Sequence, residues 1–357
     1  MDLVDHHCHG VIRREVDRAG FEALLTEAPG APEGITLFDS GVGLAVRRWC
    51  GPVLGLPADA PPEDYLLRRS ELGWHEVTSR FLRAAGIGAL CVDTGFDTSA
   101  LLSPEDMGEL AGAEPYEIVR LEQVAEEVAA GGTTAEGFAA AVLERLARRS
   151  EGAVAVKSIA AYRVGLALDG DRPSGRQVAG AAGRWLGAGG ARLADETLHR
   201  FLVWCGADLG LPIQFHVGYG DGDLDLHRCD PLLLTGLLRA LEPTGTPVML
   251  LHNYPYHRQA GYLAQVFSNV YADVGLITHN AGHRAGAVLA EALELVPYGK
   301  FLFSSDAYGL PEFYHLGALL FRRALDAFFQ DWPSADAERI KAMIGSGNAR
   351  RVYRLDQ

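Results

Sequence analysis

Residues 1–10 read Met-Asp-Leu-Val-Asp-His-His-Cys-His-Gly, and this pattern predicts the first strand of the fold. Alternate residues of an extended strand face the same side, so His7 and His9 would point together while His6 and Cys8 would face away. Two neighbouring imidazoles at a strand end can form half of a metal site, since neutral imidazole binds cations such as zinc. A solvated histidine cluster near a chain end would show the same letters. Further metal-ligating residues at later strand ends would favour the metal site over the solvated cluster.

The composition argues against several classes of partner. Lys and Arg number 32 against 46 Asp and Glu, which gives the 357-residue chain a formal net charge of −14. Nucleic acids and anionic membranes attract basic patches, so neither is an expected partner. No apolar run approaches the roughly 18 residues of a membrane span, and no secretory leader pattern is present; a cytoplasmic protein is expected. Five scattered cysteines without a CxxC spacing indicate neither a disulfide framework nor a cysteine-zinc site.

Eight short apolar runs alternate with helical patterns. The runs lie in residues 1–10, 87–95, 116–122, 153–162, 211–217, 248–252, 270–274 and 300–306. Helices are predicted over residues 71–85, 133–148, 195–206, 231–241, 285–296 and 313–329, whereas residues 164–191 resemble a glycine-rich loop. Nearly continuous apolar strands are typical of parallel sheets, and eight such units favour an α/β fold, a (β/α)8 TIM barrel, as a single domain over residues 1–357. The proline-broken stretch 11–70 would be an insertion after the first strand, forming a lid or dimer surface.

Polar side chains stand at the carboxyl ends of the expected strands, where TIM barrels place their chemistry. After the two histidines of the first strand, these positions hold Lys157, His216, His252 and Asp306. Each has an ordinary structural explanation, such as a hydrogen-bonded core histidine, an ion-paired lysine or a helix N-cap. Convergence from separate strands is harder to explain in that way, and it favours an active site.

The pattern resembles the amidohydrolase superfamily, and more closely its amidohydrolase-related branch (amidohydrolase 2), near the nodulin-like domain that is fused to glutamine synthetase. The resemblance covers the whole chain. Its most specific motifs are Asp5-x-His7-x-His9, Lys157-Ser-Ile-Ala-Ala-Tyr-Arg163, His216, His252, Ser304-Ser-Asp306-Ala, Pro311-Glu312, Leu316-Gly-Ala318 and Gly347-Asn-Ala-Arg-Arg-Val-Tyr353. It implies a TIM barrel of the metal-dependent hydrolase type.

The resemblance also implies a metal centre. Its ligands would be His7, His9, His216 and Asp306, and Asp306 would also accept the proton of the attacking water. Zinc is favoured for such ligands, with manganese, iron or nickel as alternatives, and one or two ions would bind. A cation here would lower the pKa of its water toward about 7 and polarise a substrate carbonyl. His252 would be a further ligand, a base or an electrostatic stabiliser.

Lys157 has two interpretations. In superfamily members with two metals, a lysine of the fourth strand can be carbamylated and bridge the ions. A free ammonium near Arg163 would instead bind a substrate carboxylate, and this interpretation is favoured here. Glu122, at the expected end of the third strand, is a rival bridging ligand. Asp5 is expected to orient a neighbouring group rather than to bind the metal.

The predicted function is hydrolysis of an amide or other C–N bond, without cleavage of peptide chains. The substrate would be small, polar and carboxylate-bearing, attacked by metal-activated water. The residues predicted to bind it are Arg163, Arg228, Tyr308 and Glu312, because loops after barrel strands recognise ligands. A metal-dependent non-oxidative decarboxylase and a non-catalytic regulatory module are the alternatives, and a homodimer is expected from the long insertion.

Overall fold

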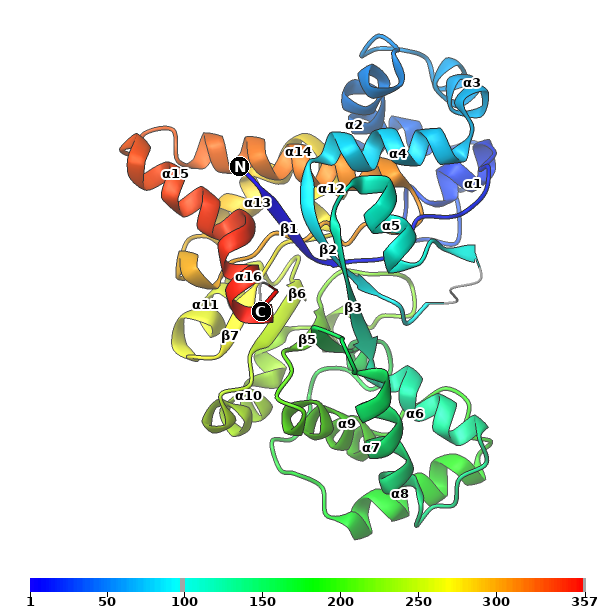
Figure 1. The fold of residues 1–357 in the computed structure, drawn as a ribbon, viewed down its shortest axis with the longest axis vertical. Helices are drawn as coiled ribbons and strands as arrows, with labels where there is room; N and C mark the ends of the chain where they lie inside the picture. Colours follow the sequence, from blue (N-terminus) through cyan, green and yellow to red (C-terminus); the bar gives the residue numbers. More distant parts are fainter. Residues whose placement is uncertain (97–99, 356–357) are drawn as a thin grey trace.

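The computed structural model describes residues 1–96 and 100–355, and a parallel sheet organises them (Figure 1). Seven strands lie side by side in chain order. They are β1 (Leu3–Cys8), β2 (Ile87–Asp93), β3 (Glu114–Arg120), β4 (Ala155–Ser158), β5 (Ile213–Val217), β6 (Val248–His252) and β7 (Val270–Ala272). Every neighbouring pair is parallel. All the carboxyl ends therefore meet at one end of the sheet.

Residues 301–307 take the place of an eighth strand, although they form no regular strand of their own. On one side the amide of Leu302 donates to the carbonyl of Ala272 in β7 over 3.1 Å. On the other side the amide of Asp306 donates to the carbonyl of His7 in β1, also over 3.1 Å. The segment thus joins the two outer strands, and the predicted α/β barrel is confirmed as the fold class.

Helices cover the outside of this sheet (Figure 1). After the insertion they are α4 (Trp74–Ala85), α5 (Pro104–Ala111), α6 (Leu121–Ala130), α7 (Phe138–Arg149), α8 (Gly175–Gly187), α9 (Glu196–Asp208), α10 (Thr235–Leu241), α11 (His257–Val266), α12 (Ile277–Asn280), α13 (Ala285–Ala292), α14 (Pro311–Phe328), α15 (Ser334–Ala342) and α16 (Asn348–Tyr353). Among the described helices, none combines the length and the apolar character that crossing a bilayer would require.

The barrel interior is filled at the amino ends of the strands. One layer of buried side chains comes from the strands and from residues 301–307, and it consists of Val4, Ala89, Cys91, Ile118, Ala155, Met249, Leu251 and Leu302. Residues of α16, including Val352 and Tyr353, pack against this layer. The amino end is therefore a packed core, which leaves the carboxyl end for polar groups.

Strand β1 changes register against β2 between Asp5 and Cys8. An extra residue of this kind re-aims the side chains around it. As a result, the consecutive residues His6 and His7 both contact groups inside the barrel: Nδ1 of His6 lies 2.9 Å from the hydroxyl of Tyr353, and His7 faces the metal-site residues. The prediction that His6 faces away was therefore wrong, whereas Cys8 is fully buried as predicted.

Several element boundaries also differ from prediction. The helix expected over residues 71–85 is α4, which Gly73 (φ 81°, ψ 150°) separates from the preceding helix in a backbone conformation that suits glycine. Residues 164–191 are not all loop, since they contain α8, which starts at a capping box between Ser174 and Gln177. Strand β3 ends at Arg120, so Glu122 lies in the first turn of α6.

The insertion after β1 carries α1 (Arg18–Ala23), α2 (Gly41–Ala45) and α3 (Pro62–Leu72). A buried ion pair joins it to the barrel: Nε of Arg69 in α3 lies 2.6 Å from Oε1 of Glu312 in α14. The hydroxyl of Tyr65 donates to the same oxygen over 2.9 Å. Because α14 begins five residues after Asp306, this contact ties the insertion to the segment that carries the predicted metal ligand.

Candidate metal centre and active-site cavity

The predicted ligands from the first and sixth strands meet around Asp306. Its Oδ1 lies 3.2 Å from Nε2 of His7 and 3.3 Å from Nε2 of His9, and its Oδ2 lies 3.1 Å from Nδ1 of His252. All four residues are buried. His7, His252 and Asp306 offer ligand atoms within 4.8 Å of one another, which is close enough for one metal ion to bind them.

Backbone strain accompanies this cluster. His252 has φ 67°, Asn253 has φ 63° and Asp306 has φ 48°, all in the left-handed region that non-glycine residues rarely adopt. Each such residue costs of order 1–3 kcal/mol and persists only where the surrounding structure holds it. The strained backbone at His252 and at Asp306 therefore lowers the stability of the fold at the two positions that bring these side chains together.

His216 of β5 lies beside this cluster, although it belongs to neither of the groups of described residues whose ligand atoms lie within 4.8 Å of one another. Its ring lies 4.6 Å from the ring of His252, measured between centroids. Within the described part of the chain, Nε2 of His216, both ring nitrogens of His252 and Oδ1 of Asp306 are buried without a hydrogen-bond partner. Buried polar atoms are normally satisfied, so a group of orphaned nitrogen and oxygen atoms indicates a missing ligand. Histidine nitrogens and a carboxylate are donors that suit a divalent transition metal.

The electrostatics keep these side chains in the metal-binding form. Burial, and then the nearby Lys157 amine, lowers the pKa of His7 to about 4 and that of His216 to about 3. Burial alone would raise the pKa of Asp306, but His252, His7 and His9 hold it well below its usual range. At neutral pH the imidazoles of His7 and His216 are therefore neutral and the Asp306 carboxylate is charged, as ligation requires.

Gln214 fixes the orientation of His7. Its amide nitrogen donates to the carbonyl of His6 and to the hydroxyl of Tyr353, each over 2.8 Å. Its Oε1 therefore accepts from Nδ1 of His7, 2.8 Å away, and Nε2 of His7 is left with a lone pair toward Asp306. Sequence reasoning missed Gln214, although it stands two residues before His216 on the same strand.

Asp93 and Arg120 are two further site residues that sequence reasoning missed. Oδ2 of Asp93 lies 2.6 Å from the Arg120 guanidinium and 3.3 Å from Nζ of Lys157. Burial raises the pKa of Asp93, but Arg120 and Lys157 outweigh this and hold it far below its usual range. Asp93 ends β2 and Arg120 ends β3, so their positions at strand ends could have predicted them as site residues. Arg120 also lies over the ring of Phe96, which contacts His9.

Asp5 contacts the segment that carries Asp306 rather than the metal-site nitrogens. Its Oδ1 accepts from the amide of Ser305 over 2.9 Å, and its Oδ2 accepts from the Ser305 hydroxyl. Burial raises the pKa of Asp5 to about 7, while the two Ser305 hydrogen bonds lower it. These contacts fix the backbone immediately before Asp306.

A cavity of about 370 Å³ opens beside the cluster. Its walls contain most of the predicted site residues, namely His9, Lys157, Arg163, His216, His252, Asp306 and Tyr308. They also contain residues that were not predicted, namely Glu27, Phe96, Arg120, Ile159, Tyr162, Arg192, Asp221, Asp223 and Leu276. The cavity can therefore hold a small polar molecule against the metal-site residues.

Apart from His7, which lies in the cluster around Asp306, three predicted residues do not line this cavity, and other contacts occupy each of them. Glu122 accepts from the hydroxyl of Ser158 (2.7 Å) and the amide of Ile159 (3.0 Å), so its carboxylate braces β4. Glu312 is buried against Arg69. Arg228 donates to the carbonyl of Val164. These contacts do not support a metal-binding or substrate-binding role for the three residues. Glu122 lies beyond the early end of β3, Glu312 faces the insertion, and Arg228 contacts the backbone of Val164.

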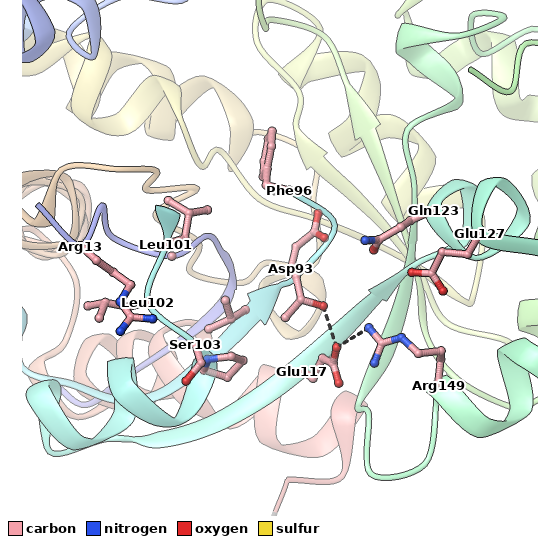
Figure 2. Close-up of a pocket in the computed structure, with 14 residues that line it drawn as sticks. Arg13, Asp93, Phe96, Leu101, Leu102, Ser103, Glu117, Gln123, Glu127 and Arg149 are labelled. Carbon is pink, nitrogen blue, oxygen red and sulfur yellow. Dashed lines mark hydrogen bonds and ion pairs between the residues drawn. The ribbon is translucent and has the colours of Figure 1, made fainter. Parts of the chain in front are cut away.

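A second, larger cavity of about 460 Å³ lies on the other side of Asp93 and Phe96 (Figure 2). Figure 2 shows Glu117 beside Arg149, from which it accepts a hydrogen bond over 2.8 Å. Glu117 also accepts from the hydroxyl of Thr94 over 2.6 Å. Glu117 and Arg149 thus pair with each other, and Glu127 pairs with Arg145 outside the cavity wall. The histidines and Asp306 do not line it, so size does not identify the reactive cavity here.

A parallel barrel whose strand ends gather histidines and a carboxylate defines a class of metal-dependent enzymes. Residues 108–355 match a family model described as an amidohydrolase. The chain belongs to this amidohydrolase family, in the branch that the sequence motifs indicated. Family and ligand set together support an enzyme that uses a divalent metal.

Relatives cover different shares of the chain. A Lactobacillus casei protein, provisionally described as a metal-dependent hydrolase, is 31% identical with a TM-score of 0.85, and the match covers 99% of this chain and 96% of that one. Protein fluG of Emericella nidulans is 33% identical over 224 residues, which is 57% of this chain and 26% of fluG. This chain therefore spans about a quarter of the length of fluG.

Two uronate isomerases share the fold at lower identity. The Bacillus halodurans enzyme is 15% identical with a TM-score of 0.65, and the match covers 99% of this chain and 93% of that one. The Thermotoga maritima enzyme is 12% identical with a TM-score of 0.64, and the match covers 99% and 94%. At these identities the likeness shows the barrel alone.

Proposed function

We propose that this protein is a metal-dependent hydrolase that cleaves an amide or other C–N bond in a small, polar substrate bearing a carboxylate. The observation that carries the proposal is the meeting of His7, His9 and His252 around Asp306, with unpartnered nitrogen and oxygen atoms in a cavity wall. The family of the chain supports hydrolysis over other chemistry.

His7, His9, His216 and Asp306 would hold the metal, with His252 as a further ligand or a base. A bound divalent cation supplies a lowered pKa for water and a polarised substrate carbonyl. We favour zinc, because His and Asp ligands suit it. The Lys157 amine is better placed for substrate or electrostatic duty than for bridging two ions, because Asp93 already pairs with it.

Asp306 has the position of the proton acceptor. It is ionised at neutral pH, so it is in the form that can take a proton from the attacking water. The same carboxyl group can then return the proton to the leaving nitrogen. Nδ1 of His252 lies 3.1 Å from the other carboxylate oxygen, so this imidazole is also close to the proton that Asp306 would accept.

Four basic side chains in the cavity wall support the proposal that the substrate bears a carboxylate. Arg163, Arg192, Arg120 and Lys157 all line the cavity. Arg163 has one ion-pair partner, Glu126 at 3.4 Å, and its buried Nε lacks a hydrogen-bond partner among the described residues. A planar guanidinium with spare donors suits a carboxylate, which it can bind through two parallel hydrogen bonds. Tyr308 lines the same cavity and would contact the substrate body.

The test is hydrolysis, by the zinc-loaded protein in ¹⁸O-labelled water, of N-acetyl and N-formyl amino acids and of amides that keep a free ammonium group, such as glutamine and Nε-acetyllysine. Hydrolysis places one labelled oxygen in the new carboxylate, whereas a decarboxylase releases CO2 and leaves the amide intact. Asp306→Asn should lose activity by about 100-fold or more, the usual contribution of a general base. Asp326→Asn on the outer surface of α14 is the matched control. Carbon dioxide release without the label would overturn the proposal.

The remaining assignments are proposals of the same kind. We place the protein in the cytoplasm, because all five cysteines are free and buried, as is common where thiols stay reduced. We treat residues 1–357 as one domain, because the insertion is tied to the barrel by a buried ion pair. A homodimer through the insertion is also proposed, and light scattering would test it.

A further inference from the structure

Glu27 reaches the active-site cavity from the insertion, whereas the rest of the cavity wall comes from later parts of the barrel and the end of β1. It follows α1 in a segment without regular structure. Within the described part of the chain, its carboxylate makes no hydrogen bond or ion pair. A carboxylate placed in a cavity wall without a partner is a costly feature, because burial removes water from a charge.

The surroundings of Glu27 carry negative charge. Burial, and then the charges of Asp306 and Asp221, raise the pKa of Glu27 to about 7. Asp221 lines the same cavity, and among the described residues its Oδ1 accepts only from the nearby amide of Asp223, over 2.8 Å. Two carboxylates therefore border one part of the cavity, and no cation of the described chain pairs with either.

Three of the four cations that line the cavity are paired with groups other than Glu27 and Asp221. Arg192 lies 3.0 Å from Asp223 and donates to the carbonyl of Tyr162 over 2.9 Å. Arg120 and Lys157 share Asp93. The cavity thus has a basic part, whose cations are partly neutralised by Asp93 and Asp223. It also has an acidic part, Glu27 and Asp221, which a positively charged ligand group would neutralise. A ligand with charges of both signs would complement both parts.

We propose that Glu27, assisted by Asp221, selects substrates that carry an ammonium group, so that the substrate class is a zwitterionic amino-acid derivative with both an ammonium and a carboxylate. This inference rests on the proposed function, because it names the substrate of the same cavity. Glu27 is a specificity-determining residue in this scheme, and the bond cleavage itself belongs to the metal-site residues.

An ammonium explains the acidic part better than a metal ion does. The groups of described residues whose ligand atoms come within 4.8 Å of one another are His7 with His9 and Asp93, and His7 with His252 and Asp306. Neither group includes Glu27 or Asp221. An ammonium has three donors on a flexible stem and tolerates carboxylates that stand further apart than a metal ion allows.

The test compares two probes that differ by one ammonium group, L-glutamate and glutarate. Their binding to the zinc-loaded full-length protein is measured by isothermal titration calorimetry at pH 8, where Glu27 is ionised. A hydrogen bond between charged groups is worth about 1.5–3 kcal/mol, so the wild type should bind glutamate about 10- to 100-fold more tightly than glutarate. Glu27→Gln should reduce this ratio to about one.

Glu33→Gln is the matched control, since Glu33 is an exposed glutamate of the same insertion. It should keep the wild-type ratio, and thermal melting of both variants should verify that they fold. An unchanged ratio in Glu27→Gln overturns the inference. So does a wild type that binds both probes equally or binds neither. Failure of the hydrolase proposal is separate, because it is measured by labelled oxygen in the product.

Discussion

The amine of Lys157 lies 2.8 Å from Nε2 of His7, the ring nitrogen that also faces Asp306. On its other side the amine lies 3.3 Å from Oδ2 of Asp93. The lone pair on Nε2 can accept from the amine or bind a cation, but it cannot do both at once. A metal at His7 therefore requires the amine to turn toward Asp93, which is already within reach.

This relationship predicts the metal content. We expect one divalent ion per chain by elemental analysis, with no change when bicarbonate is added, because an amine paired with Asp93 stays free rather than becoming a bridging carbamate. Lys157→Met should also hold one ion, and Lys341→Met, in α15, is the control. Two ions per chain that fall to one in Lys157→Met would show that the lysine bridges them.

A second prediction concerns Gln214, whose Oε1 accepts from Nδ1 of His7 over 2.8 Å. Loss of such a partner lets the ligand ring rotate and usually costs 10- to 100-fold in metal affinity. Gln214→Leu should therefore lower zinc affinity by about that factor in a chelator competition, while Gln214→Glu, which keeps an acceptor, should lose less. Gln265→Leu on the exposed face of α11 is the control. Equal affinities for Gln214→Leu and the wild type would contradict this role.

Much of the fold and of the metal site could be predicted from strand ends. In a parallel barrel every strand delivers its last residues to the same place, so His216, His252 and Asp306 could be grouped without knowledge of their distances. The same rule would have found Asp93 and Arg120, which also end strands. They were missed because an acid beside a turn and an arginine within an apolar run have ordinary local explanations.

Glu122 and Glu312 show what strand position cannot decide. Glu122 lies two residues beyond the end of β3, and that small shift moves it into a helix. Glu312 follows Asp306 closely in sequence, but its direction is set by Arg69, 243 residues earlier in the chain. Long-range pairing of this kind leaves no local pattern. The register change in β1, which turns His6 into the barrel, is equally invisible to an alternation rule.

The buried pair between Arg69 and Glu312 gives a third prediction. Removal of one partner leaves an uncompensated buried charge, which typically costs 3–5 kcal/mol. Glu312→Ala should lower the free energy of unfolding by about this amount in urea, and adding Arg69→Ala should cost less than the sum of the two single changes. Glu76→Ala breaks the exposed pair with Arg80 and should cost under about 1 kcal/mol. Strictly additive losses at Arg69 and Glu312 would argue against coupling.

A fourth prediction follows from His279, which stacks on Phe313 with ring centroids 4.4 Å apart. Burial lowers its pKa from 6.5 to about 4, although Asp306 and the Ser305 backbone oppose the shift. The unfolded chain therefore takes up a proton below pH 6.5 that the folded chain rejects until about pH 4. The stabilising contribution is complete above pH 6.5 and is lost as the pH falls through this window.

Urea unfolding of the wild type and of His279→Gln at several pH values measures this contribution. A shift of this size corresponds to about 3 kcal/mol, so the difference between the two proteins should shrink by roughly that amount between pH 7.5 and pH 4. His75→Gln, at an exposed position of α4, should follow the wild-type curve. Parallel curves for wild type and His279→Gln across the whole range would mean that the buried imidazole is protonated as readily as an exposed one, against the packing on Phe313.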